Sequence, residues 1–249
     1  MSSMENVRYL GIIADGSTDQ EIIARLAKCL LENADPAESS LEEVMLGQSL
    51  YDYTNTFRIK ASQTRDYSFC SKHALDLRNG IVTVLLAAIA EFQSKIPREL
   101  RDCDLLVLHT DAELVLSSPE KYFEEWAVVI SKIFLIAIEE FYHKTSQRGW
   151  QWEHLPLVVP LVPFPSTDIL VAAAKTENSG TFGSHGRKAR EIKIALYGVD
   201  DLRHLREEEL KQKALDFITP AACKAIYRHI PESRIFLRTL SWNQIVGAS

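Results

Sequence analysis

The strongest constraint on the fold is a short apolar run that leads into an acidic turn, and the chain contains two such runs. Val7 to Ile13 is apolar and rich in β-branched residues, and Asp15-Gly16 and a helical pattern from Ser17 follow it. Asp104 to Leu108 is the second run, and it leads into His109-Thr110-Asp111-Ala112-Glu113. Buried strands, tight turns and helix starts in this order are typical of α/β domains. We therefore expect both runs to be buried strands of one sheet.

The rest of the chain continues this order of strands and helices. Ser17 is a candidate helix cap, with Gln20 completing a capping box. Prolines within the apolar run 155–162 place it at a sheet edge or in a bent strand. A further strand is expected at 56–59. Helices are expected to begin at Ser71 or His73, after Ser118 and at Asp168, and then in short pieces at about 187–196, 206–217, 220–229 and 232–240.

These patterns predict an α/β fold class, with a small, mostly parallel sheet flanked by helices and a helical C-terminal extension. Residues 1–176 are expected to form the α/β domain, and residues 177–249 the extension packed on it. A length of 249 residues with 46% hydrophobic and 25% charged residues argues against wholesale disorder. Four cysteines without a CxxC pair disfavour a zinc ribbon or a disulfide framework. The apolar runs are too short for a membrane helix, so we expect no membrane partner and a cytoplasmic protein.

Charge is distributed unevenly along the chain. The formal net charge is −6, which argues against a nucleic-acid binder. Residues 187–238 nevertheless contain 12 Lys and Arg against 8 Asp and Glu, a local charge of +4. This basic C-terminal third indicates either contacts with nucleic acid or the solvent-facing sides of amphipathic helices. A second copy of the chain or an operon-encoded protein remains open as a further partner.

Three acids follow the two buried runs. Asp15 comes after the first run, and Asp111 and Glu113 come after the second. In a parallel sheet the carboxyl ends of neighbouring strands meet at one edge, where ligands bind. Carboxylates that converge there repel one another, and a hard divalent ion such as Mg²⁺ removes that cost. The alternative is that Asp15 and Asp111 cap the helices that follow them.

The same motifs resemble those of a known family. Asp15-Gly16-Ser17-Thr18-Asp19 after a strand looks like the first signature of Toprim domains, and Asp111-Ala112-Glu113 after a later strand looks like the second. The chain is most similar to the small Toprim-like proteins grouped as DUF4276. The stretches 159–174 and 230–240 also resemble segments of that family. The match to this family would cover most of the chain.

The resemblance implies roles for particular residues. Asp15 would act in acid–base chemistry or bind metal, and Asp111 and Glu113 would hold Mg²⁺ (or Mn²⁺). Asp19 and Asp168 would support these acids from nearby. The family usually has Glu at the first position and Asp at the last, whereas this chain has Asp15 and Glu113. Such changes move oxygen atoms within a site that needs near-octahedral geometry, so loss of activity is an open alternative.

Four further residues are candidates for contacts with the metal or the substrate. His109 directly precedes the acid pair, and it is either functional or a satisfied histidine at a strand end. His185 lies in a glycine-rich stretch beside Arg187 and Lys188, where backbone N–H groups and two cations could bind a phosphate. A plain flexible connection is the alternative for that stretch.

The motifs together lead to three functional hypotheses. The first is an Mg²⁺-dependent nuclease-like Toprim protein that hydrolyses phosphodiester bonds of DNA or RNA, in defence or repair. The second is a catalytically degenerate Toprim-like module with a regulatory or partner-binding role. A phosphohydrolase that uses Asp111 as a covalent nucleophile is disfavoured, because such a nucleophile usually follows the first strand.

Overall fold

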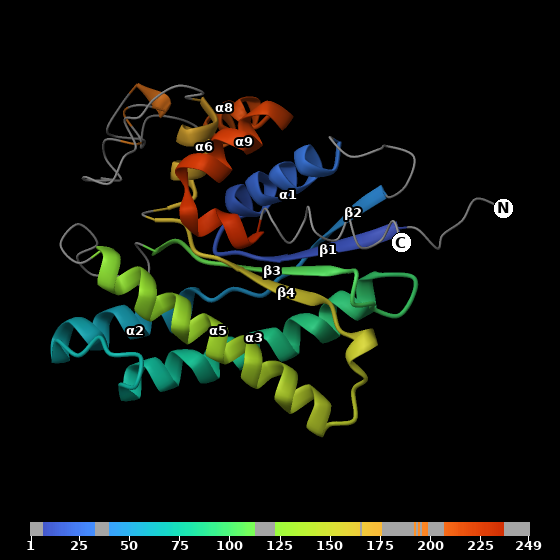
Figure 1. Cartoon of the computed structure of the whole chain (residues 1–249), viewed down its shortest axis with the longest axis vertical. Helices are drawn as coiled ribbons and strands as arrows, with labels where there is room; N and C mark the ends of the chain where they lie inside the picture. The colour runs from blue at the N-terminus through green and yellow to red at the C-terminus, as the bar shows by residue number, and fades with distance from the viewer. Residues whose placement is uncertain are drawn as a thin grey trace.

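The core of the protein is a four-stranded, all-parallel sheet (Figure 1). The computed structural model describes residues 7–32, 40–112, 123–164, 166–175, 192, 194, 196–198 and 207–236. The strands lie in the order β2-β1-β3-β4, so the two runs predicted to be buried strands are the inner pair. The strand bounds are β1 Val7–Ile13, β2 Ser40–Met45, β3 Leu105–His109 and β4 Leu157–Leu161.

Helices cover both faces of this sheet, which confirms the predicted α/β class. The described helices are α1 Ser17–Glu32, α2 Tyr51–Thr64, α3 Lys72–Lys95, α5 Phe123–Gln147, α6 Asp168–Lys175, α8 Glu207–Phe217 and α9 Pro220–His229, with single 3-10 turns η3 Trp152–His154 and η6 Pro231–Ser233. Within the described part of the chain, none of these helices has the length and apolar character needed to cross a bilayer.

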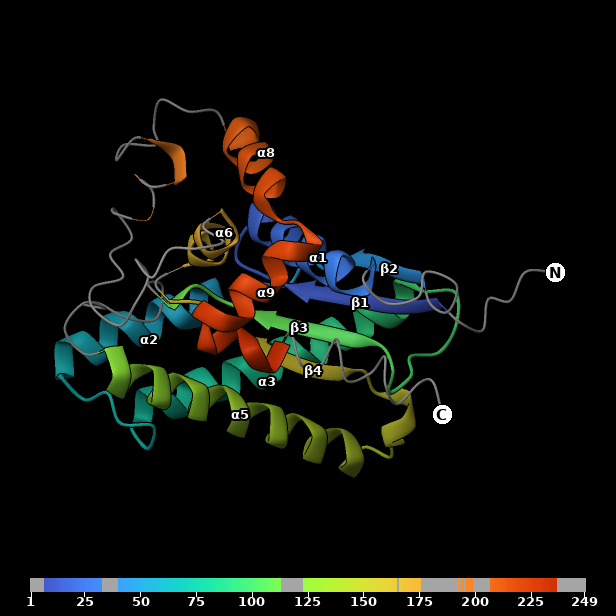
Figure 2. The same ribbon diagram turned by 45° about the horizontal axis from the view of Figure 1, so that its top comes forward.

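Two separate hydrophobic cores lie on the two faces of the sheet. One layer consists of α2, α3 and α5, and the opposite layer consists of α1, α6, α8 and α9 (Figures 1 and 2). Side chains of a strand point alternately to the two faces. In β1, Tyr9 and Ile13 accordingly belong to the α2–α3–α5 core, whereas Leu10 and Ile12 belong to the α1–α6–α9 core. This alternation also determines which acids meet at the edge of the sheet.

Most expected elements are present, and two local predictions are wrong. The strand expected at 56–59 is part of α2, and the second strand is instead β2. Thr54, Phe57 and Ala61 are buried on one side of α2 at the spacing of a helix, a period that outweighs the β propensity of Thr56 and Ile59. The helix expected to begin at Ser71 or His73 is α3, and Ser71 caps it, since its hydroxyl accepts a hydrogen bond from the Ala74 amide at 3.1 Å.

The predicted capping box at the start of α1 is the second error. Ser17 is the first residue of α1 and not the capping residue before it. The side-chain amide of Gln20 donates to the Leu46 carbonyl at 3.1 Å. The first helical bond runs from the Gln20 amide to the Gly16 carbonyl. Gln20 is buried, so its polar group forms a long-range bond that joins α1 to the end of β2.

The C-terminal helices pack on the α/β layers rather than standing apart from them. Both α8 and α9 contact α1 and α6. Ile218, Ile226, Ile230 and Phe236 are almost fully buried in the same core as Leu10 and Val107 of the sheet. The segment expected as an extension therefore completes the covering of one face of the sheet.

The amino end of the sheet holds a buried ion pair. Asp104 has no exposed surface, and both of its carboxylate oxygens accept hydrogen bonds of 2.7 Å from Arg98. The backbone amides of Tyr9 and Arg101 donate to the same carboxylate. Every partner of this acid belongs to the structural framework, so the carboxyl end of the sheet is left as the place for a functional site.

Candidate metal centre

The acids that follow β1 and β3 lie on opposite sides of the sheet edge. Asp15 has the parity of Ile13, whose side chain faces the α2–α3–α5 layer. Asp111 has the parity of His109 and Val107, which face the α1–α6–α9 layer. We expected Asp15 and Asp111 to bind one ion together, but the strand geometry turns them to opposite sides of the sheet edge.

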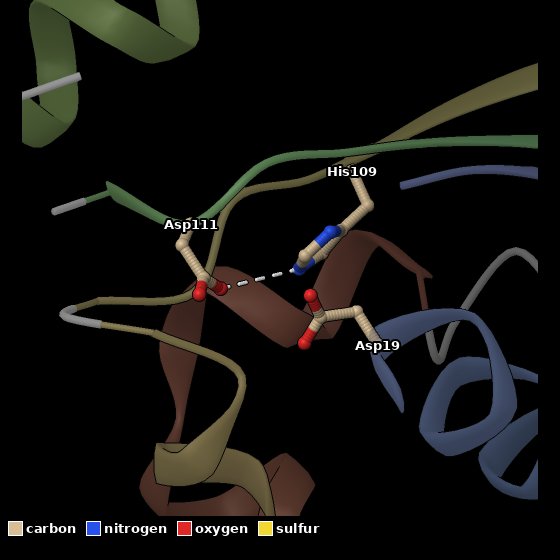
Figure 3. Close-up of side chains that lie close together, drawn as sticks. All are labelled: Asp19, His109 and Asp111. Carbon is tan, nitrogen blue, oxygen red and sulfur yellow. Dashed lines mark ion pairs between the residues drawn. The ribbon is translucent and has the colours of Figure 1, made fainter. Parts of the chain in front are cut away.

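A different group of side chains meets on the α1–α6–α9 side. Asp19 belongs to the first turn of α1, His109 ends β3, and Asp111 follows two residues later. Each of the three offers one potential ligand atom, and these atoms lie within 4.8 Å of one another. Figure 3 shows the two carboxylates and the imidazole turned toward a common point. The described residues thus contain one group that could hold a metal ion.

Thr167, at the start of α6, connects this group. Its hydroxyl lies 2.8 Å from Nε2 of His109 and donates to Oδ1 of Asp111 at 3.0 Å. The backbone amide of Thr167 donates to the same carboxylate oxygen at 2.8 Å. Thr167 also lies near enough to Asp19 to lower the pKa of that acid. Residues from α1, β3 and the β4–α6 junction are in this way held together at one point.

Burial and crowding change the protonation of the group. Burial, the nearby charge of Asp111 and a smaller contribution from Asp168 raise the pKa of Asp19 to about 6, although His109 and Thr167 act in the opposite direction. Burial by itself lowers the pKa of His109. The contact with Asp111 and the charges of Asp111, Asp19 and Asp15 outweigh that effect and raise it. Asp19 and His109 therefore both keep a proton to a higher pH than the same groups do in water.

His109 is fully buried, and its two ring nitrogens differ in their surroundings. Nε2 faces Thr167 and lies 3.5 Å from Oδ1 of Asp111. Nδ1 is buried and has no hydrogen-bond partner. Histidines that ligate metals usually donate their other N–H to a second group, which fixes the ring. The missing partner weakens His109 as a ligand.

Asp15 forms its own contacts on the other side of β3. Its two carboxylate oxygens accept hydrogen bonds from the hydroxyls of Ser49 at 3.0 Å and of Thr110 at 2.6 Å. Its charge still reaches His109, because it contributes to the raised pKa of that residue. Asp15 is thus a neighbour of the metal-binding group and not one of the three residues that form it.

Asp168 lies next to the group without joining it. Its carboxylate accepts a hydrogen bond of 2.9 Å from the hydroxyl of Tyr197, which comes from the C-terminal part of the chain. Burial and the charge of Asp168 raise the pKa of that tyrosine, so it remains a proton donor. The other predicted site residues, Glu113, His185, Arg187 and Lys188, lie outside the described residues.

The donor set restricts the ions that this group could bind. Two carboxylates and one imidazole combine hard oxygen ligands with a nitrogen ligand. Mg²⁺ prefers oxygen ligands alone, whereas an imidazole ligand favours Mn²⁺, Fe²⁺ or later transition metals. At the edge of a parallel sheet such an ion could hold an anionic substrate and lower the pKa of a bound water.

The sequence did not predict two features of this group. Thr167 was not a candidate, and the signal for it was its position directly before an acid at a helix start, after a strand that contains Pro160 and is followed by Pro163 and Pro165. His109 and Asp111, which are two residues apart, face the same side of the sheet. The pair expected to hold the ion was instead Asp111 and Glu113. No protein-family model, no curated protein and no solved structure matches the chain, so the resemblance to Toprim domains stays a prediction made from its motifs.

Proposed function

We propose that this protein is a divalent-metal-dependent phosphodiester hydrolase that acts on nucleic acid. The observation that carries the proposal is the Asp19–His109–Asp111 group, whose ligand atoms lie within 4.8 Å of one another at the carboxyl edge of a parallel sheet. The basic region 187–238, with its local charge of +4, supports an anionic polymer as the substrate.

The proposed reaction is hydrolysis of a P–O bond. Asp19, His109 and Asp111 would hold the ion, which would supply positive charge to a non-bridging phosphate oxygen of the substrate. A water oxygen forms the new bond to phosphorus, the bond to the leaving ribose or deoxyribose oxygen breaks, and that oxygen takes up a proton. The proton that the water loses would pass to solvent, because Asp15 lies on the other side of β3 and accepts hydrogen bonds from Ser49 and Thr110.

The test is cleavage of labelled single- and double-stranded DNA and RNA with Mn²⁺ or Mg²⁺. Asp111→Asn keeps the shape of the side chain but removes a ligand charge, and we expect it to lower the rate about 100-fold or more. Asp76→Asn, an exposed acid on α3, is the matched control and should leave the rate unchanged. Equal rates for wild type and Asp111→Asn, or no cleavage with either ion, would reject the proposal.

A second candidate is a non-catalytic module that keeps this fold to bind a partner. Two observations favour it: Asp111 and His109 both contact Thr167, and Nδ1 of His109 has no hydrogen-bond partner. In this case calorimetric titration with millimolar Mn²⁺ or Mg²⁺ would show no binding. Binding that Asp111→Asn abolishes would exclude this candidate.

A further inference from the structure

We propose that the hydroxyl of Thr167 is a fourth protein ligand of the ion, so that the site offers two carboxylates, one imidazole and one hydroxyl. This inference rests on the proposed metal-dependent function and deepens it. It goes beyond the three-residue group, because Thr167 has neither a charge nor a place among the usual metal-binding residue types.

The distances around the hydroxyl carry the first part of the argument. Neighbouring ligands of a six-coordinate ion with bonds of 2.0–2.1 Å are about 3 Å apart. The Thr167 hydroxyl lies 2.8 Å from Nε2 of His109 and 3.0 Å from Oδ1 of Asp111. The three atoms therefore already have the mutual spacing of ligands that share an ion, and small movements would complete the coordination.

The backbone holds the hydroxyl in this place. Thr167 is buried, and its amide donates to Oδ1 of Asp111 at 2.8 Å. The Leu170 amide donates to the Thr167 carbonyl at 2.9 Å, which anchors the residue at the first turn of α6. The backbone of Thr167 is therefore fixed beside Asp111, and its hydroxyl reaches the group without any movement of α6.

The hydrogen-bond donors and acceptors of the group also support Thr167 as a ligand. The Thr167 hydroxyl donates its one proton to Oδ1 of Asp111 and also contacts Nε2 of His109. A hydroxyl that donates its proton keeps oxygen lone pairs that can bind a cation. A cation at the common point would satisfy the lone pairs of all four side chains together, and the hydroxyl needs no loss of its proton to act as a neutral ligand.

Four protein ligands define what the ion can do. An octahedral ion would keep two positions, one for a water and one for a phosphate oxygen of the substrate. Two carboxylates balance the charge of a divalent ion. The imidazole makes Mn²⁺ the expected choice over Mg²⁺, and we expect the affinity for Mn²⁺ to be the higher of the two.

The test compares variants of Thr167 in the full chain by calorimetric titration with Mn²⁺. Thr167→Val keeps the shape and the backbone bond to Asp111 but removes the hydroxyl, and we expect affinity to fall about 10- to 100-fold. Thr167→Ser keeps the hydroxyl and should retain most of the wild-type affinity. Thr145→Val removes a similarly buried hydroxyl from α5 and is the matched control, with affinity unchanged.

The outcomes separate this inference from the function on which it rests. If wild type binds Mn²⁺ and Thr167→Val binds it equally well, Thr167 is only a hydrogen-bond partner and the inference is wrong, while the metal site stands. If wild type binds no Mn²⁺ at millimolar concentration, the proposed function fails and the inference fails with it. Melting curves in EDTA show whether each variant is folded, and Thr167→Ser provides the comparison if Thr167→Val is not.

Discussion

At the scale of single residues, alternation along β3 decides which side chains meet. His109 and Asp111 point to the α1–α6–α9 side, while Thr110 between them binds Asp15 on the other side. A shift of one residue exchanges the two faces of a strand. Two acids at neighbouring strand ends can therefore be close in space and still belong to different clusters.

The raised pKa values of Asp19 and His109 lead to a prediction about how stability depends on pH. The raised pKa of Asp19, about 6, means that the metal-free folded chain binds a proton that the unfolded chain loses near pH 4. The stabilisation from that proton is fully present below pH 4 and is lost as the pH rises to about 6. His109, with a pKa above its usual value, adds a loss of the same sign at higher pH.

Asp19→Asn removes the first of these contributions because its side chain is neutral at every pH. In EDTA we expect its Tm to exceed that of wild type at pH 8, by about 2–4 °C for each kcal/mol recovered. The difference should shrink toward pH 4. Thermal melts followed by circular dichroism across this range provide the measurement, and parallel curves for the two proteins would contradict the raised pKa.

At the scale of elements, close packing of α3 on β1 requires a glycine. A Cβ at Gly11 would lie 3.0 Å from the ring of Phe92 and 3.1 Å from Cδ1 of Leu106. Phe92 is fully buried, so its ring has little room to move away. The absence of a side chain at position 11 therefore sets how closely this helix layer approaches the sheet.

Gly11→Val is expected to lower the free energy of unfolding by about 1–3 kcal/mol, the usual cost of overpacking. Urea titration followed by circular dichroism measures this loss. Gly47→Val is the control, because a Cβ there would meet only the carboxylate of Glu91 at 3.7 Å and should cost less. A loss at position 11 no larger than that of the control would show that α3 can shift freely.

At the scale of the whole molecule, the C-terminal helices belong to the same cooperative unit as the sheet. Ile226 of α9 is fully buried in the core that includes Leu10 and Val107. Ile226→Ala should therefore lower the stability of the whole chain by about 2–5 kcal/mol. Lys224→Ala, on the exposed side of α9, should stay within about 0.5 kcal/mol of wild type.

Urea unfolding followed by both far-ultraviolet circular dichroism and tryptophan fluorescence tests this prediction. One transition that shifts with Ile226→Ala is expected, with the same midpoint for both probes. Two transitions, only one of which moves, would show that residues 177–249 unfold as a separate unit. The site would then be independent of the C-terminal part of the chain, despite the Tyr197–Asp168 contact.

Local patterns were sufficient to predict β1, β3 and β4, the helices α1, α3 and α5 and the class of the fold, whereas β2 and α2 were missed. The bounds of β1, the cap at Ser71 and the edge position of β4 follow from apolar period, a capping residue and prolines, which act over a few neighbouring residues. The error at 56–59 arose because that stretch is too short for its period to separate strand from helix.

The composition of the site depends on contacts between distant segments. Asp19, His109, Asp111 and Thr167 come from three regions of the chain, and they meet because α1 and α6 pack on one face of the sheet. Strand order, facial parity and the position of a helix start must combine before such a group exists. The conformational preferences of single residues contain no information about contacts between distant segments. The motifs could therefore identify candidate acids, but only the tertiary packing decided which residues lie beside them.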